Sequence, residues 1–199
     1  MDIKAQAGIG TMIIFLAGII VAAITANVLV QTATSLQNQA LESGKQAQKS
    51  ISTIAQALGV SAMNATDNTI EDFRMDLKLS PGSEPINMQD ALLTLSIDDA
   101  SYDLTYSNKS CTNSLVSGYY TNASEGNGTF SIKYLLKSPN HREGILQRGE
   151  LATLCFASGK SIGEDRDIDI RFVPGVGMPT ALSIVTKNVM NNYIVNLYP

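Results

Sequence analysis

The sequence has 199 residues, a length that suits one or two domains, and carries 14 Lys and Arg against 18 Asp and Glu, for a formal net charge of −4. This balance leaves no basic surface that could follow a phosphate backbone, so it argues against a nucleic-acid partner. The charge is also unevenly distributed, because only Asp2, Lys4, Glu42 and Lys45 are charged within the first 45 residues. The chain therefore divides into an apolar, Ala-rich front and a polar body.

The apolar segment from Ala7 to Val30 has three interpretations. As a transmembrane helix it would extend about 36 Å, enough to cross a hydrocarbon core of about 30 Å. As a secretory signal peptide it would be unusually long, and the preceding "MDIK" is barely positive. The third interpretation is a helix that packs against copies of itself.

The sequence that follows favours the third interpretation. No charged residue occurs from Ala5 to Leu41. Apolar or small residues then recur at steps of three and four, a spacing typical of one helix face. This stripe consists of Leu36, Ala40, Ser43, Ala47, Ile51, Ile54 and Leu58. We therefore expect one helix from about Ile3 to about Leu58, with Gly59 as its stop.

A lone membrane anchor has no use for a stripe that lies beyond the bilayer, whereas a bundle of helices does. One helix cannot bury an apolar surface on all sides, but copies of itself can. Small residues would let such helices approach closely, and they lie at Ala17, Gly18, Ala22, Ala23 and Ala26. We predict a polymerisation core that includes Ile13, Phe15, Ile20, Ala23, Leu36, Ile51, Ile54 and Leu58.

After Gly59 the hydrophobic period changes to two, which predicts strands. Apolar residues alternate with polar ones around 73–80, 93–98, 130–137 and 167–172, and turn-forming segments such as "SPGSEP" and "PGVGMP" separate the runs. Short strands with one polar face predict an antiparallel β-sandwich. The expected fold is therefore α+β, with a long N-terminal helix at residues 1–59 and a β-sandwich domain at residues 60–199.

Two features of the body predict covalent modification. Cys111 and Cys155 could form a disulfide if the body is extracellular, or remain two buried thiols, and the sequence leaves both outcomes open. Sequons for N-glycosylation begin at Asn64, Asn108, Asn122 and Asn127. We expect glycans at these sites, with a chance excess of sequons as the alternative.

Candidate catalytic chemistry is sparse. The one histidine, His141, lies in the loop "SPNHREG", where we expect a solvated side chain and can assemble no catalytic triad. Phosphate-binding and dinucleotide-binding motifs are absent from the sequence. Two acidic clusters offer oxygen ligands to calcium without the EF-hand spacing, so calcium is a weak option. They are Asp98, Asp99 and Asp103, and Glu164, Asp165, Asp167 and Asp169. We expect no catalytic residue, no cofactor and no enzyme.

Sequence motifs occur at both ends of the chain. The N-terminal motifs are "GIGT" at Gly8–Thr11 and "VAA" at Val21–Ala23, and the C-terminal one is the turn with Pro174, Gly177 and Pro179. Together they resemble the archaeal flagellins, or archaellins. The resemblance implies a filament with a core of helices wrapped by immunoglobulin-like outer domains, the archaellum that drives swimming. It also implies a short leader removed by a prepilin-like peptidase, for which cleavage between Ala5 and Gln6 is the best candidate.

These features are compatible with three functions. The leading one is a structural subunit that self-associates into the archaellum on the cell surface, after a membrane-inserted stage, with other archaellins as further candidate partners. The alternative is an archaeal type IV pilin that forms an adhesion filament by the same helix logic. The third is a monomeric membrane-anchored binding domain, which predicts charges soon after the span, where the sequence has none.

Overall fold

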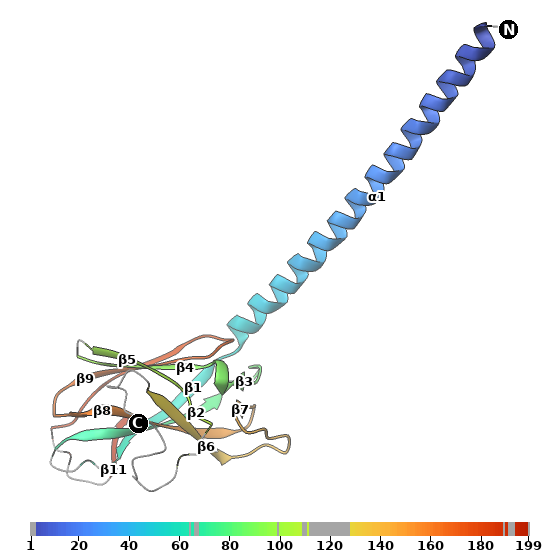
Figure 1. Ribbon diagram of the computed structural model, residues 1–199. Coiled ribbons are helices and arrows are strands. Elements are labelled where there is room, and N and C mark those ends of the chain that lie inside the picture. The colour runs from blue at the N-terminus through green and yellow to red at the C-terminus, as the bar shows by residue number, and fades with distance from the viewer. Residues whose placement is uncertain are drawn as a thin grey trace. The chain divides into compact units, whose positions relative to one another are not determined.

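The computed structural model describes residues 3–63, 65, 68–98, 100–108, 111, 128–188, 190 and 194–198. The chain divides into two compact units at Ala47 and Gln48, and each is described by itself. The first unit is part of one helix, α1 (Ile3–Ser52), drawn in blue in Figure 1. Its 50 residues extend about 75 Å at the usual rise. The single long helix is confirmed.

The predicted end of that helix at Leu58 is wrong, because α1 ends at Ser52. A turn at residues 80–84 binds the backbone groups that a continuing helix would use. The amide of Ile54 donates to Ser83 Oγ at 3.0 Å, and the carbonyl of Ile54 accepts from the amide of Ser80 at 2.9 Å. Gly59, expected as the helix stop, instead lies within the first strand.

Strands make up the regular structure of the second unit together with one short 3₁₀ helix. They are β1 (Ala55–Met63), β2 (Ile70–Leu79), β3 (Ile86–Asn87), η1 (Met88–Asp90), β4 (Leu92–Ile97), β5 (Ala100–Tyr106), β6 (Thr129–Leu136), β7 (Ile145–Leu146), β8 (Leu151–Ile162), β9 (Asp167–Val173), β10 (Thr180–Val185) and β11 (Ile194–Tyr198). The alternating segments that predicted strands coincide with β2, β4, β6 and β9 to within one residue at their C-terminal ends, which confirms these strands. The first strand, β1, was not predicted.

The strands hydrogen-bond in the order β10-β9-β4-β5-β6-β8-β2-β1-β11, with β3 and β7 as a separate pair. Among the described pairs, all are antiparallel except β5 and β6, which meet over two residue pairs only. This thin junction divides the ladder into a four-stranded and a five-stranded layer, visible in the lower part of Figure 1. The predicted β-sandwich is confirmed.

The inner faces of both layers share one apolar core. Four phenylalanines fill its centre with almost no exposure: Phe73, Phe130, Phe156 and Phe172. Phe73 and Phe156 stack with ring centroids 5.5 Å apart. Burying aromatic side chains of this size contributes more than any other residue type to such a core. The body therefore has an apolar core of its own that stabilises its fold.

The first and last strands of the body, β1 and β11, are neighbours in the sheet. β11 pairs with the second half of β1, where Val60 lies opposite Tyr198 and Met63 opposite Ile194. Beside the start of β1 lies the turn before β10, through an isolated bridge between Ile54 and Met178. β1 is thus held by β2 on one side and by segments more than 100 residues away on the other, which explains why local sequence did not predict it.

Candidate functional site

α1 carries most of the exposed large hydrophobic side chains among the described residues. Consecutive residues in a helix are rotated by about 100°, so four in a row cover its whole circumference. Ile13, Ile14, Phe15 and Leu16 are all exposed, Phe15 by 70%. A helix that is apolar on every side is typical of a buried or membrane environment. By length and composition, the helix from Gly8 to Ser52 could cross a membrane.

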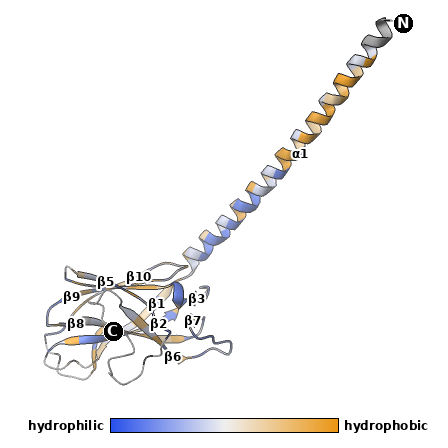
Figure 2. Ribbon diagram, in the orientation of Figure 1, coloured by the Kyte–Doolittle hydropathy of each residue, from blue (hydrophilic) through white to orange (hydrophobic). Residues whose placement is uncertain are grey.

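Hydropathy changes along α1, as Figure 2 shows by the change from orange toward the N-terminal end to white and blue near Ser52. Of the predicted polymerisation core, the residues on α1 are all exposed: Ile13, Phe15, Ile20, Ala23, Leu36 and Ile51. The other two, Ile54 and Leu58, lie outside the helix, and placing them on its stripe was wrong. They belong to the bridge beside β10 and to β1.

Four threonine hydroxyls of α1 bond to the backbone of the helix itself. Thr25 Oγ1 donates to the carbonyl of Val21 at 3.0 Å, and Thr34 Oγ1 donates to the carbonyl of Val30 at 2.8 Å. Thr11 and Thr32 bond backward in the same way. Hydroxyls that bond to their own helix do not need water, so these residues are compatible with an apolar environment.

Three glycines near the start of α1 have no role within this chain. A Cβ added to Gly8, Gly10 or Gly18 would meet no atom within 4 Å. Glycine in a helix costs roughly 0.5–1 kcal/mol relative to alanine, so its presence calls for a compensating contact. Close approach of another helix is the usual reason for small residues on an apolar helix.

The two cysteines of the body are joined. Cys111 and Cys155 form a disulfide, with their Cα atoms 5.9 Å apart. Both residues are buried, and Cys155 lies in the central part of β8 between β6 and β2. Disulfides persist in oxidising compartments, so this bond favours a body that is outside the cytoplasm.

A hydrogen-bonded cluster lies at residues 134–150 and includes His141. The prediction that the His141 side chain is solvated is wrong. The His141 side chain is only 13% exposed and lies between two carboxylates, with Nδ1 2.9 Å from Glu150 Oε1 and Nε2 3.1 Å from Glu143 Oε1. Its ring packs edge-on against Tyr134. Sequence could not bring these partners together, because they meet only through the turns around β7.

Glu150 is the centre of this cluster, and its side chain is fully buried. Burial alone would raise the pKa of Glu150, but hydrogen bonds from the Gln147 amide, His141 and Ser138 hold it below its ordinary value. Burial also raises the pKa of Tyr134. A buried carboxylate with this many donors fastens a loop.

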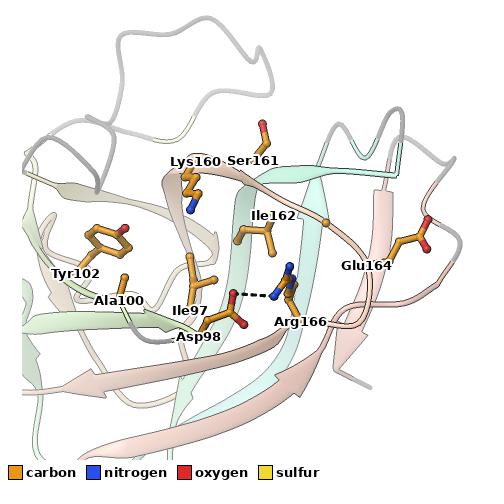
Figure 3. A pocket seen from close by; sticks show the side chains of 10 residues that line it. Ile97, Asp98, Ala100, Tyr102, Lys160, Ser161, Ile162, Glu164 and Arg166 are labelled. Carbon is orange, nitrogen blue, oxygen red and sulfur yellow. Dashed lines mark hydrogen bonds and ion pairs between the residues drawn. The ribbon is translucent and has the colours of Figure 1, made fainter.

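A pocket of about 490 Å³ lies between the β4–β5 turn and the β8–β9 turn. Figure 3 shows Asp98 and Arg166 joined across it, with Arg166 Nη1 3.3 Å from Asp98 Oδ2. Of the expected acidic clusters, Asp99 lies outside the described residues, and Asp103 accepts from Thr94 Oγ1 at 2.8 Å. In the described part of the chain, no group of three or more His, Cys, Asp or Glu side chains is placed to hold a metal.

The remaining predicted sites are only partly described. Asn108 is exposed just after β5, while Asn64, Asn122 and Asn127 lie outside the described residues. Ala5 and Gln6, the candidate cleavage position, lie on α1, and their side chains are likewise outside the description.

A helix with exposed apolar side chains, followed by a β-sandwich with an internal disulfide, is typical of assembly subunits, in which other molecules cover the helix. The chain belongs to the family of archaeal-type flagellins, whose model matches residues 5–184. The resemblance of its ends to archaellins is thereby confirmed. The members of this family are structural flagellins.

Individual relatives agree with this assignment. Flagellin B1 of Methanocaldococcus jannaschii is 25% identical over 202 residues, covering 96% of this chain and 93% of that protein. Flagellin B1 of Thermoplasma volcanium is 36% identical over 110 residues, so the chain spans 44% of that protein's length. In fold, the chain is similar to the archaeal flagellum of Methanospirillum hungatei strain JF1, with a TM-score of 0.69, 13% identity, and coverage of 94% and 98%.

Proposed function

We propose that this protein is a structural subunit that polymerises through α1 into the archaellum, the filament used for swimming. The observation that carries the proposal is the 50-residue helix whose large apolar side chains are exposed all round. Beyond the membrane segment, each Leu or Ile of α1 that passes from water to full burial contributes roughly 1.5–3 kcal/mol. Copies of the same helix supply a matching apolar surface, and the glycines without intramolecular neighbours allow close approach.

Before assembly, the segment from Ala7 to Val30 of α1 spans the membrane, with Lys4 held on the cytoplasmic side. The body then lies outside, where the Cys111–Cys155 disulfide is stable. Transfer of the helix from lipid to the filament exchanges one apolar environment for another, so its hydrophobic cost is small. Closer packing between helices adds dispersion contacts that lipid supplies less well.

Further properties complete the proposal. The leader ends between Ala5 and Gln6, the sequons carry glycans, and the mature filament lies on the cell surface, with other archaellins as further partners. The protein has no enzymatic role, cofactor or nucleic-acid partner. An intact mass equal to that of the unmodified sequence would remove the glycans from this description.

The experiment replaces Ala23 by Asp in the full chain. The carboxylate would be buried among apolar helices without a partner, at a cost of several kcal/mol. We expect the filament fraction sheared from cells to be lost while the body of the protein still folds. Gln46→Asp is the matched control, because Gln46 lies exposed on the polar part of the same helix; it should leave filaments intact.

Normal filaments from Ala23→Asp would refute assembly through α1. A motility assay of a strain that lacks the protein separates the archaellum from an adhesion pilus, because only loss of the archaellum abolishes swimming. The pilin alternative is not favoured, since the family whose model matches is a flagellin family.

A further inference from the structure

The turn between β9 and β10, residues 174–179, is held rigidly between two other segments. A Cβ on Gly175 would lie 2.6 Å from the Cβ of Asp90, and a Cβ on Gly177 would lie 2.6 Å from the carbonyl oxygen of Thr53. Gly177 also has a φ of +129°, a conformation that other residues rarely adopt. The sequence "PGVGMP" therefore fits this place because only glycine allows such close backbone contact.

Hydrogen bonds fix the turn to the residues just after α1. The Met178 amide donates to the Thr53 carbonyl at 2.8 Å, and Thr180 Oγ1 donates to the carbonyl of Ala55. Both prolines restrict the backbone further, because the ring fixes φ. The turn is consequently pre-organised and has little conformational freedom to lose on binding.

This rigid turn exposes apolar side chains. Val176 is 48% exposed and Met178 is 47% exposed, while Ile51, two residues before Thr53, is 68% exposed. A single exposed apolar residue needs no explanation. Val176 and Met178 lie on the turn whose Met178 amide bonds to the carbonyl of Thr53, two residues after Ile51. We call Ile51, Val176 and Met178 the turn patch.

We propose that the turn patch is a second assembly contact, which docks on the apolar surface of α1 of a neighbouring copy. The inference rests on the proposed function, because it needs a second copy of the chain. It assigns to the body a direct part in holding the filament, beside the contacts made by helices alone.

The occupant follows from continuity and charge. Ile51 is the last apolar residue of α1, and in sequence it continues the stripe that begins at Leu36. The turn carries no charged residue, and neither does the helix from Ala5 to Leu41. Lys49 lies two residues before Ile51, and the Glu84 amide donates to Thr53 Oγ1 at 3.2 Å, so charged residues lie close to the patch. An apolar centre with a polar rim is the usual composition of an interface.

The test compares two double variants of the full chain. Val176→Thr with Met178→Gln keeps side-chain size but makes the turn patch polar. Leu135→Gln with Val185→Thr does the same at two other strand positions, each 54% exposed. We expect the first pair to lower the yield of sheared filaments at least tenfold, equivalent to about 1.4 kcal/mol per subunit, and the control pair to leave it unchanged.

Body folding is followed separately, by the thermal midpoint of tyrosine fluorescence in detergent-solubilised protein. It should be the same for both pairs and the parent, because all four side chains are half-exposed. Parent-like filament yield and heat resistance in the first pair would overturn the inference.

A photoreactive residue at position 178 provides an arm that does not depend on filament yield. Irradiated filaments should give a dimer whose cross-linked peptide comes from residues 8–41 of the second copy. Cross-links confined to one copy, or to another body, would overturn the inference. If Ala23→Asp abolishes filaments while the turn variants do not, the proposed function stands and only the turn contact fails.

Discussion

Removal of the Cys111–Cys155 disulfide should destabilise the body by an amount that follows from the length of the loop that the bond closes. The bond closes a loop with a sequence separation of 44 residues. In the chain-entropy account, a loop of this length restricts the unfolded chain enough to stabilise the native state by about 4 kcal/mol at 25 °C. Replacing either cysteine by alanine should therefore lower the free energy of unfolding by that order.

The assay is urea unfolding of the detergent-solubilised full chain, followed by tyrosine fluorescence. All seven tyrosines lie beyond residue 100 and the sequence has no tryptophan, so the signal reports the body and not α1. With a slope of about 2 kcal/mol per molar urea, the midpoint should fall by about 2 M. Cys111→Ala, Cys155→Ala and the double variant should behave alike, because each breaks the same bond.

Two results would refute this reasoning. A midpoint within experimental error of the parent would mean that the bond does not restrict the unfolded chain. A double variant much less stable than either single variant would mean that the cysteines act through separate packing. Because both residues are buried, dithiothreitol alone should also leave the native bond intact and reduce it only in urea.

Two further predictions concern the loop cluster and the helix. The pKa of Glu150 is lower in the folded protein than in the unfolded chain, so its contribution to stability is present above the unfolded pKa near 4.5 and is lost as the pH falls through the folded pKa. Glu150→Gln should therefore destabilise the body by about 1–3 kcal/mol at pH 7. The same change should make the urea midpoint depend less on pH in the acidic range. Gly18→Leu should leave the body unchanged, because a side chain there meets nothing in this chain, yet weaken the filament by blocking close helix approach; higher heat resistance of these filaments would contradict the inferred packing.

The parts of the fold that sequence predicted are those in which local pattern and final environment agree. β2, β4, β6 and β9 each have one face in the core and one in solvent, so their polarity alternates. β1 was missed because "AQALGVSAM" is rich in small residues and continues the helical spacing of three and four. Its conformation is decided by β2 and β11, and the pairing with β11 involves residues more than 130 positions away.

The candidate sites follow the same division. The apolar surface of α1 could be predicted because it depends only on the hydropathy of consecutive residues in one helix. The glycine turn was recognised as a turn, but its contacts with Asp90 and Thr53 could not be, since both come from other segments. The role of His141 was missed for the same reason, because Ser138, Glu143 and Glu150 surround it only after the loop has folded.

The body of the chain buries its apolar side chains within itself, whereas α1 leaves its apolar side chains exposed. The body has a shared apolar core, a disulfide and a buried carboxylate whose donors are all supplied internally. The helix satisfies its own threonine hydroxyls, yet its apolar side chains and its glycines have no neighbours in this chain. Folding and assembly are thereby assigned to different residues. Substitutions in the core should change the unfolding midpoint at constant filament geometry, and substitutions on α1 should do the reverse. Val176 and Met178 connect the two processes, because a turn that only the folded body can hold in place presents the surface that a neighbouring helix would meet.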